Sequence, residues 1–255
     1  MASEKKVRTG FHEVLFYLAS EDRLALLAEL STKKRRLKDL SRVINASPQE
    51  CSRHLSRLSE AGMIEKDSDG LFGMTDLGRA IVRLFPSTRF LLSNGDYFLS
   101  HDLTFLPKGF LERIGELSGA EYVHHFSSVL ELIKKVISSG EEHVWLISDQ
   151  PMVVGPTIGP TFFSTDVPVR LIGLPDIDKR VVAQMRSSLP KSEIVYLPEV
   201  KIAMAMNESM AGVCFPDSYG GIDFAAGFAG ADPIFREWCH DLFEFYWSRA
   251  RRVAP

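Results

Sequence analysis

The chain lacks the patterns that mark several large classes of protein. Only three of its 255 residues are cysteines, Cys51, Cys214 and Cys239, and their spacing fits neither a disulfide framework nor a zinc site. A sensing role for Cys239 with the adjacent His240 stays open as an alternative. No apolar run reaches the roughly 18 residues of a membrane span, and the N-terminal MASEKKVRTG has no apolar signal region. With 45% apolar and 25% charged residues, we expect a globular, cytoplasmic protein without membrane association.

Sequence motifs of common enzymes are also missing. There is no Walker A loop and no GxGxxG, HExxH or GxSxG motif. His124 and His125 are adjacent, so their side chains should diverge rather than share a metal. His101 and Asp102 form a candidate catalytic dyad, but no nucleophile or metal completes it, and a turn capped by Asp102 is the preferred interpretation. We therefore expect no enzyme, no catalytic residue, no metal and no cofactor.

A capped helix is the clearest feature that is present. Ser47 is a candidate N-cap, Pro48 suits the first helical position, and Glu50 completes a capping box. The helix should end near Ala61, because Gly62 can adopt the left-handed conformation that stops a helix.

The residues around this helix predict a winged helix-turn-helix. A shorter helix precedes it from Leu37 and turns at Asn45. Two short strands follow, 63–66 and 71–74, joined by a turn of aspartate, serine and glycine. Thr75 should cap one more helix, with Leu77, Ala80, Ile81 and Leu84 on its inner side.

The exposed face of the capped helix predicts DNA binding. Cys51, Leu55 and Leu58 repeat at helical spacing and should be buried, which turns the polar side chains outward. Such side chains can reach base edges and phosphates in a major groove. The predicted double-stranded DNA contacts are Gln49, Ser52, Arg53, Ser56 and Arg57 on the helix and Lys66 on the wing. One such domain covers too little DNA for tight specific binding, so we expect a homodimer, joined by apolar surface on the second domain or on helix 75–84.

Charge gives modest support for a nucleic-acid partner. Residues 1–84 contain 15 lysines and arginines against 12 acids, whereas the whole chain has a net charge of −3. Five cations crowd the segment just before the first helix of the motif, where phosphate contact is plausible. A solvated basic loop is the alternative. These cations are Lys33, Lys34, Arg35, Arg36 and Lys38.

The remainder of the chain predicts a second domain. We expect a DNA-binding domain over 1–86, a linker over 87–96, and an α/β effector or sensor domain over 97–255. Short apolar runs such as 144–147 and 169–172 alternate with helical patterns, which is typical of a mostly parallel sheet. Ser128 should cap a helix, and Asp232 with Pro233 should start the last one.

A small-molecule site is expected at the carboxyl ends of these strands. Asp149 and Gln150 follow the strand 144–147, and Arg170 lies on the strand 169–172. We predict these three as ligand-binding residues for an effector of unspecified identity, with the glycine- and proline-rich loop 155–160 folding over them. A salt bridge to a nearby acid is the alternative for Arg170.

Four further segments are FHEVLFYLASEDRLALLAEL, SPQECSRHLSRLSEAGMIEK, HDLTFLPKGFLERIGEL and FAGADPIFREWCHDLFEFYW. Together they resemble a family of archaeal winged-helix transcriptional regulators related to the methanogenesis regulator FilR. This resemblance implies a transcription factor whose second domain senses a signal. In outline the second domain is also similar to the effector domains of archaeal sugar-responsive regulators. That similarity implies a phospholipase-D-like fold without catalysis, since the HxKxxxxD motif is missing.

Two other functions are left open by the sequence. The winged helix could dock a transcription or signalling protein instead of DNA. An α/β enzyme using His101 or Asp102 is the third hypothesis, weakened by the missing motifs.

Overall fold

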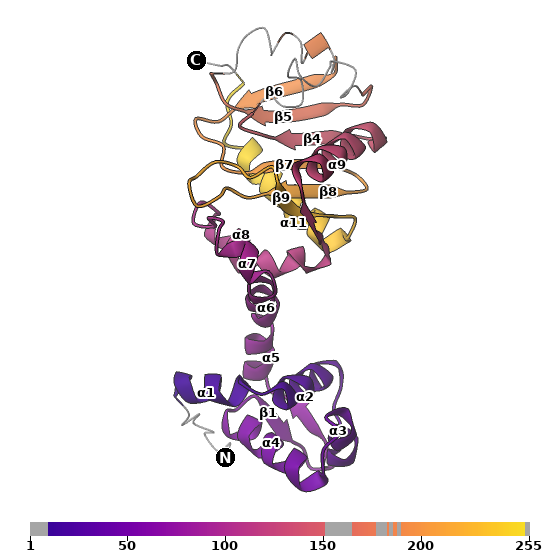
Figure 1. Ribbon diagram of the computed structural model, residues 1–255. Helices are drawn as coiled ribbons and strands as arrows, with labels where there is room; N and C mark the ends of the chain where they lie inside the picture. The colour runs from indigo at the N-terminus through magenta and orange to yellow at the C-terminus, as the bar shows by residue number, and fades with distance from the viewer. Residues whose placement is uncertain (1–9, 151–164, 177–182, 184–185, 188–189, 253–255) are drawn as a thin grey trace. The chain divides into compact units, whose positions relative to one another are not determined.

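The computed structural model describes residues 10–150, 165–176, 183, 186–187 and 190–252. The chain divides into two compact units, 1–85 and 86–255, each with an apolar core of its own (Figure 1). The predicted loop 155–160 and most of the helix expected after Asp176 lie outside the described residues. Among the described helices, none has the length and apolar character needed to cross a membrane.

The N-terminal unit is a winged helix-turn-helix domain. Its core joins the inner faces of the first helices to the two wing strands. The wing is antiparallel, with Ile64 opposite Met74 and Lys66 opposite Phe72. The elements are α1 (Phe11–Leu18), α2 (Glu21–Thr32), α3 (Leu37–Val43), α4 (Pro48–Glu60), β1 (Ile64–Lys66), β2 (Phe72–Met74) and α5 (Asp76–Val82).

The predicted start and end of α4 are confirmed. The Ser47 hydroxyl accepts a hydrogen bond from the Glu50 amide at 3.2 Å, and Pro48 occupies the first turn. Gly62 has φ +70°, the left-handed conformation that glycine adopts without steric cost. The turn before α4 uses Asn45 in the same region, with φ +50°.

The predicted inner side of the next helix is wrong in part. Thr75 caps α5 by accepting a hydrogen bond from the Gly78 amide at 3.0 Å, as expected. Leu77 and Leu84, however, are 43% and 67% exposed, and Ala80 is exposed as well, whereas Ile81 packs against the core. Gly78 faces the domain instead, and a Cβ there would lie 2.0 Å from the Met63 carbonyl oxygen. This close approach turns the glycine inward and the leucines outward.

The C-terminal unit has helices around a seven-stranded sheet. The helices are α6 (Phe85–Ser93), which begins at the division between the units, α7 (Gly95–Phe98), α8 (Lys108–Glu112), the 3-10 helix η1 (Ile114–Gly119), α9 (Phe126–Ser139) and α11 (Pro233–Trp247). The strands are β3 (Glu121–His124), β4 (Val144–Ile147), β5 (Val169–Gly173), β6 (Ser192–Tyr196), β7 (Ala203–Asn207), β8 (Ala211–Cys214) and β9 (Ala226–Gly230).

The sheet is mixed, and the prediction of a mostly parallel sheet is wrong. Its strand order is β3-β9-β8-β7-β4-β5-β6. Only the β4–β5 and β5–β6 pairs are parallel, whereas the other four neighbouring pairs are antiparallel. The reason is that the hairpin β7–β8 pairs with β4 and then extends the sheet through β9 and β3. Antiparallel neighbours of this kind need only short connections.

Two helices cover opposite faces of this sheet (Figure 1). Because neighbouring strand residues point to opposite faces, Trp145 of β4 stacks on Phe243 of α11, with ring centroids 4.7 Å apart. The next residue, Leu146, packs in a core with Val136 of α9. The unit therefore has three layers, α9, sheet and α11. Helix α9 begins at Phe126, two residues before its predicted cap Ser128.

The stretch 87–96 is not the linker that the sequence predicted. It is mostly helical, in α6 and the start of α7. Phe90 is buried and packs on Phe228 of β9, with ring centroids 5.2 Å apart. This aromatic contact, made with a residue far along the chain, anchors the stretch to the core of the C-terminal unit.

Candidate nucleic-acid interface

Helix α4 presents a polar face to solvent. Its apolar residues Cys51, Leu55 and Leu58 are all buried in the N-terminal core. Fixing this stripe inward leaves the other side of the helix exposed. The predicted contact residues on that side are all exposed: Gln49, Ser52, Arg53, Ser56 and Arg57.

The wing adds a cation next to this helix in the chain. Lys66 ends β1 and is exposed. Its ammonium lies 5.4 Å from the centre of the Phe72 ring on β2, close enough for a cation–π contact. Lys66 is thus held on the wing with its charge still open to solvent.

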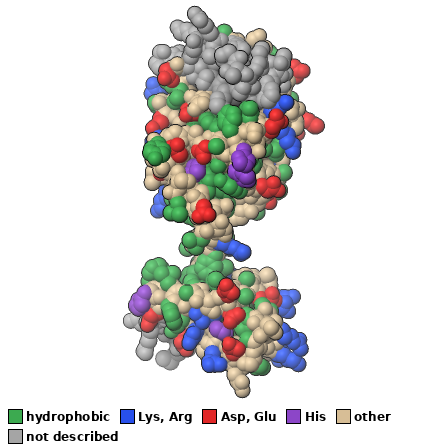
Figure 2. Space-filling model, in the orientation of Figure 1, with side chains coloured by type: hydrophobic (Ala, Val, Ile, Leu, Met, Phe, Trp, Pro, Cys, Tyr) green, Lys and Arg blue, Asp and Glu red, His purple; other side chains and the backbone are tan. Residues whose placement is uncertain are grey.

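The cations of the basic segment before α3 fall into two groups: two have acidic partners on the wing or on α2, and the others are exposed. The Lys34 ammonium lies 3.0 Å from the Asp67 carboxylate at the tip of the wing. The Arg35 Nε donates to Glu29 at 2.6 Å, and the Arg35 backbone pairs with Phe72. Lys34 therefore holds the wing through its side chain and Arg35 through its backbone, while the Arg35 side chain is held by α2. Figure 2 shows lysine and arginine side chains gathered at one side of this unit. The exposed cations of the segment include Lys33, Arg36 and Lys38.

A buried arginine beneath α4 was missed by the sequence reasoning. Arg23 of α2 is buried and donates to the carbonyls of Phe16 and Tyr17 at the end of α1. Its Nη1 also lies 3.4 Å from Nδ1 of His54 on α4. Burial, followed by the positive charge of Arg57, lowers the pKa of Arg23. The sequence does contain a signal for this burial, because Arg23 lies three residues before Leu26, which is itself buried.

The structure does not bring the three predicted ligand residues of the second unit together. Arg170 pairs in register with Trp145 inside the sheet, whereas Asp149 and Gln150 follow the end of β4. The Arg170 guanidinium lies 2.9 Å from the Glu244 carboxylate. It also lies 5.3 and 5.1 Å from the rings of Trp145 and Trp247. The salt-bridge alternative for Arg170 is confirmed.

Asp149 has an unusual environment. Its Oδ1 is buried and has no hydrogen-bond partner within the part of the chain that the structure describes. Burial raises the pKa of this carboxyl group, because a charge is disfavoured away from water.

His101 and Asp102 do not form a dyad with each other. Asp102 accepts a hydrogen bond from the Thr104 amide at 2.7 Å, so it caps a turn. The His101 ring stacks on Tyr97, its Nδ1 lies 2.7 Å from the Tyr97 carbonyl, and its Nε2 lies 3.1 Å from Asp223. Both ring nitrogens of His101 are therefore already engaged, one with the Tyr97 backbone and one with the Asp223 side chain.

Metal and thiol chemistry gain no support from the geometry. The described residues contain no group of three or more His, Cys, Asp or Glu side chains suited to a metal ion. All three cysteines are buried, and burial raises the pKa of the Cys214 thiol to about 12. Cys239 is buried in α11 while the His240 side chain is half exposed, so these two neighbours face different surroundings.

Comparison with known proteins supports the N-terminal assignment. A family described as a helix-turn-helix domain matches residues 18–67, the span from the end of α1 to the wing. The chain therefore carries a winged helix-turn-helix domain, a fold common among DNA-binding proteins. No curated protein matches the sequence.

Several solved structures show weak likeness to this chain over most or all of its length. The archaeal chromatin protein TrmBL2 is 11% identical with a TM-score of 0.37, covering 96% of this chain and 100% of its own. A putative IclR-family transcriptional regulator from Rhodococcus sp. is 12% identical with a TM-score of 0.23, covering 100% of both chains. The riboflavin-analogue dimethyltransferase RosA from Streptomyces davawensis is 13% identical with a TM-score of 0.28, covering 73% and 63%. Likeness at this level does not define the fold or the activity of this chain.

Proposed function

We propose that this protein is a transcriptional regulator that binds double-stranded DNA through α4. The observation that carries the proposal is the exposed face of α4, where Arg53 and Arg57 stand among hydrogen-bonding side chains on a capped helix anchored by a buried stripe. Such a face can enter a major groove. Lys66 of the wing would contact the DNA backbone, where phosphate pairing adds affinity without sequence choice.

The active species would be a homodimer that reads two half-sites. A second copy suits the large apolar side chains that α1 and α5 leave in solvent, since exposed apolar surface of this kind often marks an interface. These include Phe11, Leu15 and Phe16 on α1 and Leu77 on α5. Sedimentation of the full chain should therefore give twice the 28.6 kDa mass of one copy.

The second unit would sense a small molecule or partner and change operator binding. Membership of the FilR-like regulators and a phospholipase-D-like outline for this unit belong to the same proposal, and both rest on sequence resemblance. A protein-docking role for the winged helix is the second candidate, favoured if the same face of α4 binds without salt dependence.

A DNA titration tests the proposal. Binding of the full chain to the upstream region of its own gene should weaken steeply between about 50 and 200 mM salt, because phosphate contacts release counterions. Arg53→Ala/Arg57→Ala should weaken binding about 100-fold and reduce the salt slope by about two. The matched control is Arg89→Ala/Lys135→Ala, which removes two exposed cations of the C-terminal unit and should retain most of the affinity.

The outcomes separate the candidates. Equal losses in both double variants would mean that net charge, not α4, determines binding. No binding to this region or to pooled genomic fragments by the folded chain would contradict the DNA proposal.

A further inference from the structure

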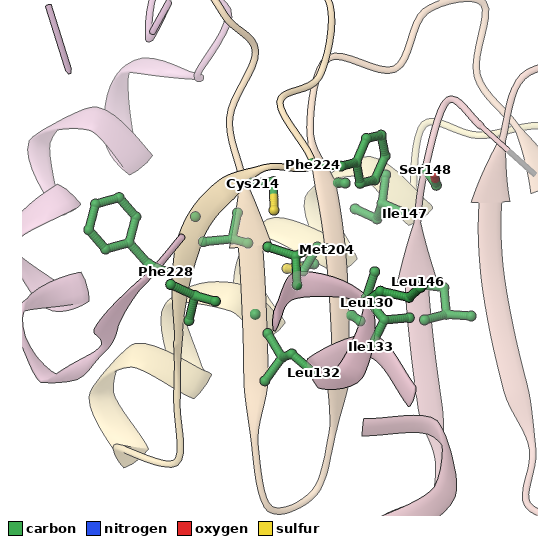
Figure 3. A pocket seen from close by; sticks show the side chains of 17 residues that line it. Leu130, Leu132, Ile133, Leu146, Ile147, Ser148, Met204, Cys214, Phe224 and Phe228 are labelled. Carbon is green, nitrogen blue, oxygen red and sulfur yellow. The ribbon is translucent and has the colours of Figure 1, made fainter. Parts of the chain in front are cut away.

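An apolar cavity of about 40 Å³ lies between α9 and the sheet of the C-terminal unit (Figure 3). Leu130, Leu132 and Ile133 of α9 form one wall. Ala205 of β7 and Gly212 of β8 belong to the opposite wall. The cavity thus separates a helix from the middle strands of the sheet.

The helix covers this part of the sheet incompletely. Leu130, Leu132 and Ile133 are only half-buried, although they face buried strands. Leu132 already reaches the far wall, since a Cβ at Gly212 would lie 2.6 Å from its Cδ2. Outward movement of α9 could therefore enlarge the cavity without breaking any strand pairing.

The lining has no charged side chain among the described residues. Ser148 is polar, but its hydroxyl already bonds to the backbone of Gln150 at 2.8 and 3.1 Å. The Cys214 thiol, with its pKa raised to about 12 by burial, stays neutral. An ion in this cavity would lose its hydration without gaining a partner from the lining residues.

The cavity reaches the carboxyl end of β4 at Ser148. Ligands of open α/β sheets commonly bind at the carboxyl ends of parallel strands, and β4 is parallel to its neighbour β5. Small-molecule sites are also mostly apolar with few polar groups. Position and chemistry therefore agree on a ligand site rather than on a site for an anion.

We propose that this cavity binds the apolar end of a small uncharged molecule and that α9 moves outward to admit it. In the regulator, this molecule would be the effector that changes DNA affinity. The regulatory half of the inference rests on the proposed function, whereas binding itself does not.

Thermal unfolding of the full chain provides the test. All three tryptophans lie in the C-terminal unit, at positions 145, 238 and 247, so their fluorescence reports on that unit alone. The probes are hexan-1-ol, hexanoate and hexylammonium, which share one chain length and differ in charge. At ten times its Kd, hexan-1-ol should raise the Tm by about 4 °C, whereas hexanoate and hexylammonium should both have little effect.

Two variants separate a ligand site from a packing void. Ala205→Leu would fill the cavity and should abolish the shift by hexan-1-ol. The matched control, Ala225→Leu, enlarges an exposed alanine of the same unit and should keep the shift. If Ala205→Leu fails to fold, Ile133→Phe on α9 fills the space from the other side.

Each outcome tests a separate part of the proposal. No Tm shift in the wild type, or an equal shift in Ala205→Leu, would overturn the site. A shift without any change in DNA affinity would overturn the effector role. Absent DNA binding under all conditions would contradict the proposed function and leave the Tm result standing.

Discussion

Helices α4 and α11 begin in the same way, but α4 exposes a polar face to solvent whereas α11 supports the core. Each has an N-cap side chain followed by proline, Ser47-Pro48 in α4 and Asp232-Pro233 in α11. Helix α4 buries a narrow stripe and leaves its polar face in solvent. Helix α11 buries large side chains, among them Trp238 and Phe243. The start signal therefore fixes where a helix begins, while the width of its apolar face decides whether it supports the core or remains available to a partner.

The largest expected difference concerns core truncation in the two helices. Leu242→Ala in α11 and Leu55→Ala in α4 each remove a buried leucine and should each cost about 3 kcal/mol. Because the tryptophans all lie in the C-terminal unit, only Leu242→Ala should lower the Tm measured by their fluorescence. Circular dichroism should detect both losses.

The comparison fails if Leu55→Ala lowers the fluorescence Tm equally. The two compact units would then unfold as one cooperative body. Ala225→Leu at an exposed site serves as the neutral reference for both measurements.

The caps should give smaller and graded effects. The Asp232 carboxylate accepts from the amides of Ile234 and Phe235, both at 3.0 Å, whereas the Ser47 hydroxyl accepts from one amide. We expect Asp232→Ala to cost about 1.5 kcal/mol and Ser47→Ala about 1 kcal/mol in chemical denaturation.

Function should reverse this order. Ser47→Ala should weaken DNA binding, because it loosens the first turn of the helix that carries Arg53. Asp232→Ala should leave DNA affinity unchanged. A larger loss of affinity from Asp232→Ala would contradict the assignment of α4 as the recognition helix.

Local signals account for what the sequence predicted well. The start of α4 at Pro48, its end at Gly62 and the wing turn depend on residues a few positions apart. The start of α11 at Pro233 is of the same kind. These elements are confirmed within about one residue.

Long-range contacts account for what it missed. The mixed strand order depends on β4 pairing with β7, about sixty residues later, which no local pattern encodes. The helical stretch 87–96 is ordered by Phe90 against Phe228. Likewise, the sequence left open which acid pairs with Arg170, and the structure shows that it is Glu244 of α11. The DNA contacts on α4 and the ligand site remain predictions.

The smallest expected effects concern two carboxylates held by backbone amides, one in each unit. The Leu71 amide, followed by Lys34, lowers the pKa of Asp67. Burial raises the pKa of Glu208, but hydrogen bonds from the backbone of Glu141, of Glu208 itself, and of Glu142 and His143 together outweigh it, so that pKa is also lowered. Both groups therefore stabilise the folded chain above their unfolded pKa values of about 3.9 and 4.3, and that stabilisation is lost as the pH falls through the lowered folded values.

In an NMR titration, the amide shifts of Leu71 and Glu141 should report midpoints below these ordinary values. Asp67→Asn should abolish the titration at Leu71 and leave that at Glu141 intact, since the two carboxylates lie in separate units. A midpoint at Leu71 at or above the ordinary value for aspartate would show that the wing turn does not hold this carboxylate in solution.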